Sequence, residues 1–134
     1  MKTLGSNLAC VVATVGVLSG GLTAAYADIK DYEFQLVQSD VKKGEGAIVA
    51  VRLLNKKTGK PVPDAVIFAK RIDMAPDGMA SMAETIEQIP SQEQGIYRFK
   101  TNLTMAGRWQ LSLGAKIQGE TASLERKLVL KATP

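Results

Sequence analysis

Short runs of alternating apolar and polar residues fill most of the chain beyond its N-terminal segment. In residues 31–40, Tyr32, Phe34 and Leu36 alternate with charged and polar residues, which is the period-two pattern of a half-buried β-strand. Beyond the N-terminal segment, no apolar pattern with helical spacing extends over three turns. The alternation therefore predicts a domain built from strands.

About seven such strands are expected, separated by turn residues roughly every ten positions. The segment 56–65, for example, gathers threonine, glycine, two prolines and aspartate, the composition of a turn. Short strands at this spacing favour an all-β sandwich over a barrel. The predicted strands cover residues 31–40, 46–55, 66–73, 84–90, 96–103, 108–117 and 122–132.

The N-terminal segment has the three parts of a secretory signal peptide. Lys2 precedes an apolar run over residues 8–22, and the run is followed by small residues at Ala25 and Ala27. A basic start, an apolar centre and an A-x-A site predict export and cleavage after Ala27. An uncleaved N-terminal anchor is the alternative. We expect residues 1–27 to be removed and 28–134 to form one domain in the periplasm, without stable membrane insertion.

The composition excludes most catalytic chemistry. The chain has no histidine, and its one cysteine, Cys10, lies inside the predicted signal peptide. The usual general base, the common nucleophile–base pairs, and zinc or Cu(II) sites built on imidazole or thiolate are therefore missing. The carboxylates Asp73, Asp77, Glu84 and Glu87 resemble ordinary loop and edge charges. We expect a binding module and no enzyme.

The net charge of +4 is mild, and basic residues do not cluster with aromatic ones. Such a pattern is weak evidence for nucleic acid, and we expect no nucleic-acid partner.

The soft ligands that remain are methionine thioethers, and they are concentrated in one segment. Residues 73–83, "DMAPDGMASMA", contain Met74, Met79 and Met82, and Met105 lies just before Trp109. Thioether sulfur is a soft, neutral ligand that selects Cu(I), and by the same softness Ag(I), over hard ions. Trp109 could lie over a bound cation and shield it, since indole is the strongest aromatic partner for cations.

Two other interpretations of these methionines stay open on the sequence alone. Their flexible side chains suit the filling of an open end of the sandwich. They also suit an adaptable surface that docks a protein partner. The spacing Met-x4-Met-x2-Met is not a specific metal signature.

Several motifs together resemble the YtkA-like (FixH-like) domain family of exported bacterial proteins, over about residues 45–131. The resemblance rests most on Thr58–Val62, Pro63–Ala65, the loop 73–82, Gly95–Tyr97 and Ala106–Trp109. It implies an immunoglobulin-like antiparallel β-sandwich. It also implies a periplasmic accessory role in the handling or efflux of heavy metals, especially copper.

With this resemblance, the sequence leads to one principal hypothesis and one rival. In the first, Met74, Met79, Met82 and optionally Met105 bind Cu(I) or Ag(I) reversibly and pass it to an efflux pump or its membrane-fusion adaptor. In the rival, an immunoglobulin-like interaction module docks an adaptor or another envelope protein without metal.

Overall fold

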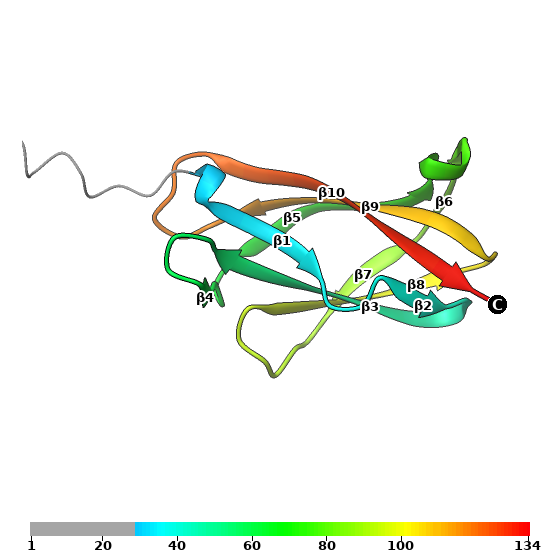
Figure 1. Ribbon diagram of the computed structural model, residues 1–134, viewed down its shortest axis with the longest axis horizontal. Helices are drawn as coiled ribbons and strands as arrows, with labels where there is room; N and C mark the ends of the chain where they lie inside the picture. The colour runs from blue at the N-terminus through cyan, green and yellow to red at the C-terminus, as the bar shows by residue number, and fades with distance from the viewer. Residues whose placement is uncertain (1–28) are drawn as a thin grey trace, which may run out of the picture.

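The computed structural model describes residues 29–134 and shows two β-sheets packed face to face (Figure 1). One sheet, here the first sheet, has the strand order β1-β3-β8-β7, with β4 beside β3. The second sheet has the order β2-β10-β9-β5-β6. The elements are η2 (Ile29–Asp31), β1 (Tyr32–Leu36), β2 (Asp40–Lys42), β3 (Gly44–Asn55), β4 (Lys60–Pro61), β5 (Val66–Met74), η3 (Ala75–Asp77), β6 (Met79–Glu84), β7 (Ile86–Ile89), β8 (Ile96–Leu103), β9 (Gly107–Lys116) and β10 (Ser123–Thr133).

The predicted all-β sandwich is confirmed. The predicted signal peptide, with Ala25 and Ala27, lies outside the described residues. No helix in residues 29–134 is long and apolar enough to cross a membrane.

The core lies between the two sheets and is built by the period-two alternation. In β9, Trp109, Leu111 and Leu113 are buried while the residues between them are not. In β3, Val51 and Leu53 are likewise fully buried. Burial of each large apolar side chain stabilises the fold by about 1.5–3 kcal/mol. The alternating pattern therefore fixes which face of each strand turns inward.

The first predicted strand, 31–40, is divided between the two sheets. Strand β1 pairs antiparallel with β3 in the first sheet, and β2 then pairs parallel with β10 in the second. Between them, the Val37 N–H donates to the Ala50 carbonyl, and the Lys131 N–H donates to the Ser39 carbonyl. The prediction of one strand was wrong because alternation does not reveal which sheet supplies the hydrogen-bond partners.

A second change of sheet occurs after the methionine-bearing segment. Strand β6 pairs with the end of β5 in the second sheet, whereas β7 pairs with β8 in the first. Residues 79–83 were expected to be a loop, and this expectation was wrong. The sequence of β6, "MASMAE", contains no β-branched residue, so its strand conformation comes from pairing with β5 and not from propensity.

The turn predicted at 56–65 is confirmed, although β4 within it adds two residues to the first sheet. The Tyr97 hydroxyl holds the last part of this connection by two hydrogen bonds. It donates to the Val62 carbonyl at 2.6 Å and accepts from the Ala65 N–H at 3.0 Å. These two hydrogen bonds set the point at which β5 begins.

Gly95 and Gly59 provide a matched pair for testing backbone constraint. Both have positive φ, +79° and +73°, but an added Cβ at Gly95 would lie 2.4 Å from Pro61 Cβ, whereas the space beside Gly59 is open. Gly59→Ala should cost about 1–2 kcal/mol of unfolding free energy from backbone strain alone. Gly95→Ala should cost about 2 kcal/mol more because the contact with Pro61 must also shift. Urea denaturation of both variants measures the difference, and equal losses would contradict the close approach.

Candidate functional site

The methionines of the described chain lie at one end of the second sheet, on the right in Figure 1. Met74 is the last residue of β5, η3 makes the turn, and Met79 begins β6. Met82 lies further along β6, and Met105 lies in the turn between β8 and β9. Two loops far apart in sequence thus contribute to the same end of the molecule.

An irregular register brings Met74 of β5 opposite Met79 of β6. Met74 pairs with Met79 and Ile72 pairs with Glu84, with a register shift between Asp73 and Met74. Ile72 and Met74 are two residues apart and share a face of β5, so their partners share that face of β6. At Ile72 and Met74 that face is completely buried. Met82 lies in the part of β6 that has no paired residue in β5, and it is 38% exposed.

Burial separates the five candidate residues into two groups. Met74 and Trp109 are completely buried, and the Trp109 Nε1–H donates to the Met105 carbonyl at 3.1 Å. Trp109 is therefore part of the core, and its ring has no exposed face to cover an ion at the surface. Met79 is partly buried against the core, while Met82 and Met105 are each 38% exposed. Three thioethers, those of Met79, Met82 and Met105, are accessible.

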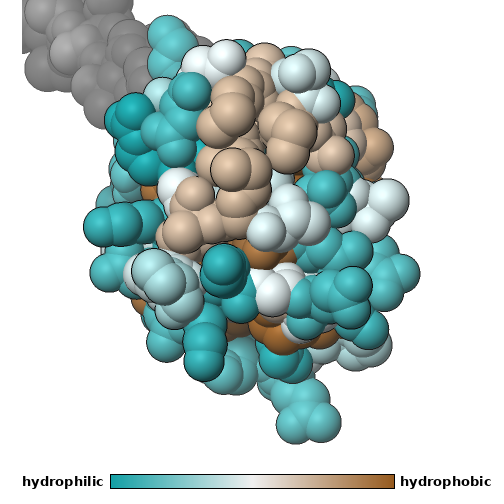
Figure 2. All heavy atoms as spheres, turned by 90° about the vertical axis from the view of Figure 1, so that its right-hand side faces the viewer, coloured by the Kyte–Doolittle hydropathy of each residue, from teal (hydrophilic) through white to brown (hydrophobic). Residues whose placement is uncertain are grey.

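The surface around these methionines is apolar. Ala80 and Ala83 of β6 and Ala106 of the β8–β9 turn are all exposed. Figure 2 views this end of the molecule and shows moderately hydrophobic side chains, in tan, gathered in the upper half of the view among hydrophilic ones. We call the surface formed by Met79, Ala80, Met82, Ala83, Met105 and Ala106 the end face.

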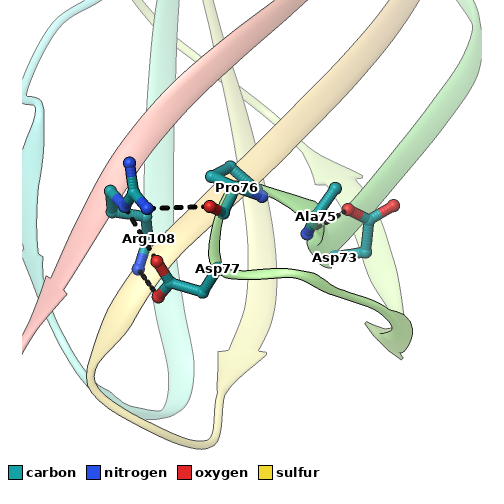
Figure 3. A network of polar contacts seen from close by, with 5 residues as sticks. All are labelled: Asp73, Ala75, Pro76, Asp77 and Arg108. Carbon is teal, nitrogen blue, oxygen red and sulfur yellow. Dashed lines mark hydrogen bonds and ion pairs between the residues drawn. The ribbon is translucent and has the colours of Figure 1, made fainter.

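Arg108 and two aspartates hold the turn that carries the end face (Figure 3). The Arg108 backbone N–H and Nε each donate to the Asp77 carboxylate at 2.8 Å, and Nη2 donates to the Pro76 carbonyl at 2.8 Å. On the other side of η3, Asp73 Oδ1 accepts from the Ala75 N–H at 2.9 Å. Hydrogen bonds to a carboxylate are stronger than neutral ones, so the turn is fixed at both of its ends.

The two aspartates therefore have structural roles that the sequence did not reveal. Asp73 is 4% exposed and also accepts from Arg71 Nε at 2.8 Å. The sequence "APDG" does predict a tight turn, and Gly78 closes it with a left-handed backbone. Nothing in the sequence pairs Asp77 with Arg108, because the two residues are 31 positions apart.

Gly107 allows the two loops to approach closely. An added Cβ at Gly107 would lie 2.7 Å from both Asp77 Oδ2 and the terminal methyl carbon of Met74. The thioether of Met74 thus fills the space beneath the turn. Met74 is better described as the core support of the end face than as one of its exposed ligands.

The chemistry available at this end is that of thioethers on an apolar surface. Within residues 29–134, no group of three or more His, Cys, Asp or Glu side chains is placed to hold a metal ion. Neutral thioethers need no deprotonation before they bind a soft monovalent cation.

The hydrogen bonds from Arg108 lower the pKa of Asp77 below its ordinary value of 3.8. A lowered folded-state pKa adds stability above the unfolded-state pKa, and this stability is lost as the pH falls through the folded-state value. The Asp77→Asn variant should therefore unfold more easily than the native protein by a constant amount between pH 5 and 7.

The difference should shrink as the pH falls below about 4, because the native carboxylate then becomes protonated as well. Thermal unfolding of both proteins from pH 7 to pH 2 measures this. Asp64→Asn is the control, since Asp64 is exposed and forms no ion pair among the described residues. A gap between Asp77→Asn and the native protein that is independent of pH would show that the Arg108 contact does not depend on charge.

Two solved structures match this chain at low identity and with TM-scores below 0.5. The "ZirS C-terminal Domain" is 13% identical with a TM-score of 0.46, over 84% of this chain and 75% of that one. A conjugative transposon lipoprotein from Bacteroides eggerthii is 11% identical with a TM-score of 0.34, over 75% of this chain and 96% of that one. A search of curated proteins finds no significant match.

The model of the YtkA-like family, in contrast, matches residues 26–114. This match covers more than half of the sequence, and the chain therefore belongs to the YtkA-like family.

Proposed function

We propose that this protein is an exported, non-catalytic accessory domain that handles a soft monovalent metal ion, Cu(I) or Ag(I), at its end face. The ligands are the accessible thioethers of Met79, Met82 and Met105. Met74 supports them from the core. The ion passes from this site to an efflux pump or its membrane-fusion adaptor in the periplasm.

The observation that carries the proposal is the contact between the two methionine-bearing loops. The register shift between Asp73 and Met74 sets Met79 opposite Met74 at the start of β6. Met105 lies in the turn that precedes Arg108, and Arg108 is joined to the η3 turn by its bonds to Asp77. The Arg108–Asp77 ion pair thus holds residues from two loops at one end of the molecule.

Partial exposure of these thioethers also fits a carrier. A buried site would release its ion slowly, whereas Met82 and Met105 are each 38% exposed and can exchange ligands with an acceptor. Thioethers carry no charge, so binding a monovalent cation leaves a net positive site with modest affinity.

Titration with Ag(I), which does not change oxidation state in air, tests the proposal. In protein labelled with ¹³C at the methionine methyl groups, the signals of Met79, Met82 and Met105 should shift with a stoichiometry of one ion per chain. The Met79/Met82/Met105→Leu variant should lose binding by at least about tenfold, because leucine conserves volume but has no sulfur.

Met74→Leu is the matched control, because Met74 is equally close in sequence but fully buried. It should retain the affinity of the native protein. Equal binding by the triple variant and the native protein, or no shift of the three methyl signals, would show that the end face is not a metal site.

The rival function, docking of a protein partner without metal, is favoured by one separate observation. The exposed methionines have exposed alanines beside them, Ala80, Ala83 and Ala106, and such a surface offers apolar contact to a partner as well as sulfur to an ion.

Met82→Lys combined with Met105→Lys separates the two functions when the purified adaptor is the probe. Under the docking function, the double variant loses adaptor binding in metal-free buffer, because charges would be buried at the interface. Met82→Leu with Met105→Leu should keep it, because the apolar surface remains. Metal-free docking would be rejected if the native protein bound the adaptor only in the presence of Ag(I) and both double variants lost this binding.

A further inference from the structure

One long edge of the second sheet has no strand beside it. Strand β5 pairs with β9 from Val66 to Asp73, but β6 pairs only with Ile72, Asp73 and Met74. The chain leaves the second sheet at Glu84 and continues as β7 in the first sheet. Residues 66–71 of β5 therefore present unpaired backbone N–H and C=O groups along the edge that faces away from β9.

A β-bulge within this edge places an aromatic ring on the outer face of the sheet. Ile67 pairs with Ala115 and Ala69 pairs with Gly114, so Phe68 is the extra residue. An added Cβ at Gly114 would lie 2.9 Å from Phe68 Cζ, so the ring lies against the backbone of β9 where a side chain is missing. Phe68 is nevertheless 53% exposed, and Val66 is 64% exposed.

Beside this ring, a cleft of about 500 Å³ crosses the outer part of β5, β9 and β10. It is lined by Ala69, Lys70, Arg71, Ser112, Leu113, Gly114, Glu125, Arg126 and Lys127. Four of these nine residues are basic and one is acidic. Arg71 is paired with Asp73, and Arg126 donates to the Glu125 carbonyl. Lys70 and Lys127 have no ion pair within the described chain.

The other open edge of this sheet is protected differently. Strand β2 pairs only with Lys131, Ala132 and Thr133 of β10, so the preceding part of β10 also lacks a neighbour. That part carries three consecutive charged residues, Glu125, Arg126 and Lys127. Charges on an edge strand prevent unwanted pairing. The β5 edge carries no charge from Val66 to Ala69.

We propose that the β5 edge binds an extended segment of another protein in which apolar and acidic residues alternate. The segment adds a strand beside residues 66–71 through main-chain hydrogen bonds. Its apolar side chains contact Val66 and Phe68 on the outer face of the sheet, and its carboxylates, which alternate to the opposite face, lie beside Lys70. Strand addition to an exposed edge is a general mode of peptide recognition.

Charge favours this partner over a second copy of the chain. Residues 66–72 include Lys70 and Arg71 but no carboxylate. Two copies paired along this edge would bring four cations into one short ladder, and like charges across a ladder are destabilising. An acidic strand would instead neutralise them.

This inference is independent of the metal function, because it uses none of the methionines, and Val66 and Phe68 lie at the opposite end of β5 from Met74. The probe is a fluorescein-labelled, capped octapeptide of alternating valine and glutamate. It should bind with a dissociation constant of about 10–100 μM at low salt, and binding should weaken as salt is added. The same peptide with lysine in place of glutamate should bind at least about tenfold more weakly.

Two further measurements locate the site. Hydrogen exchange of the backbone amides between Val66 and Arg71 should slow when the glutamate peptide is bound. A glutamate peptide with alternate backbone nitrogens methylated should lose binding, because it cannot complete a ladder on the open edge.

Charge reversal tests the recognition without removing core residues. Lys70→Glu should weaken peptide binding by about tenfold. Lys56→Glu, in the turn between β3 and β4 of the other sheet, changes the net charge equally and should leave binding unchanged. Addition of Ag(I), or the Met79/Met82/Met105→Leu substitutions, should have no effect on peptide affinity.

Several outcomes would overturn the inference. These are equal binding of the glutamate and lysine peptides, no amide protection in residues 66–71, or equal effects of the two charge-reversal variants. Slowed exchange of these amides in a concentration-dependent dimer would assign the edge to a second copy. Binding to phosphatidylglycerol vesicles without binding to the peptide would assign the surface to a membrane.

Discussion

Backbone groups at the edges of a sheet need hydrogen-bond partners, and this requirement determines how the two sheets of this domain are joined. At one side, the chain passes from β1 in the first sheet to β2 in the second. At the other side, it passes from β6 in the second sheet to β7 in the first. Each change of sheet covers part of an edge. Each also leaves part of a neighbouring strand uncovered.

Both surfaces to which we assign proposed functions follow from the second of these changes. Because β6 pairs with the last three residues of β5, the methionine segment is held as a strand with a shifted register. Because β6 ends there, the first six residues of β5 remain an open edge. The end face and the β5 edge are therefore two results of the same short pairing, at opposite ends of one strand.

The methionine-bearing end also shows how a core and a surface share one residue type. Met74 is fully buried and packs near Gly107, whereas Met82 and Met105 reach the solvent. The filling role applies to Met74, whereas the proposed binding role concerns the methionines that reach the solvent. The Arg108–Asp77 contact joins β9 to the η3 turn, which lies between Met74 and Met79 in the sequence.

The sequence predicts the sandwich well because alternation reports burial directly. It predicts β3, β5, β8 and β9 nearly to their ends, and β8 and β9 in particular alternate between buried and less buried residues. It misses β6, whose residues have little strand propensity, and it joins β1 to β2, since alternation continues while the partner sheet changes. The candidate methionines were identified by residue type, but their separation into buried and exposed depends on a register shift. Such shifts, and long-range contacts such as Arg108 with Asp77, are set by tertiary packing and leave no local pattern.

The bulge at Phe68 has a consequence for how this family of domains can vary in length. In a regular strand, loss of one residue turns every following side chain to the opposite face. Here Ile67 faces inward opposite Ala115, and Ala69 faces outward opposite Gly114. Deletion of Phe68 would leave these two residues adjacent with their faces unchanged. The strand can therefore shorten by one residue at this point and keep its core, while losing only the aromatic ring that it presents to the outside.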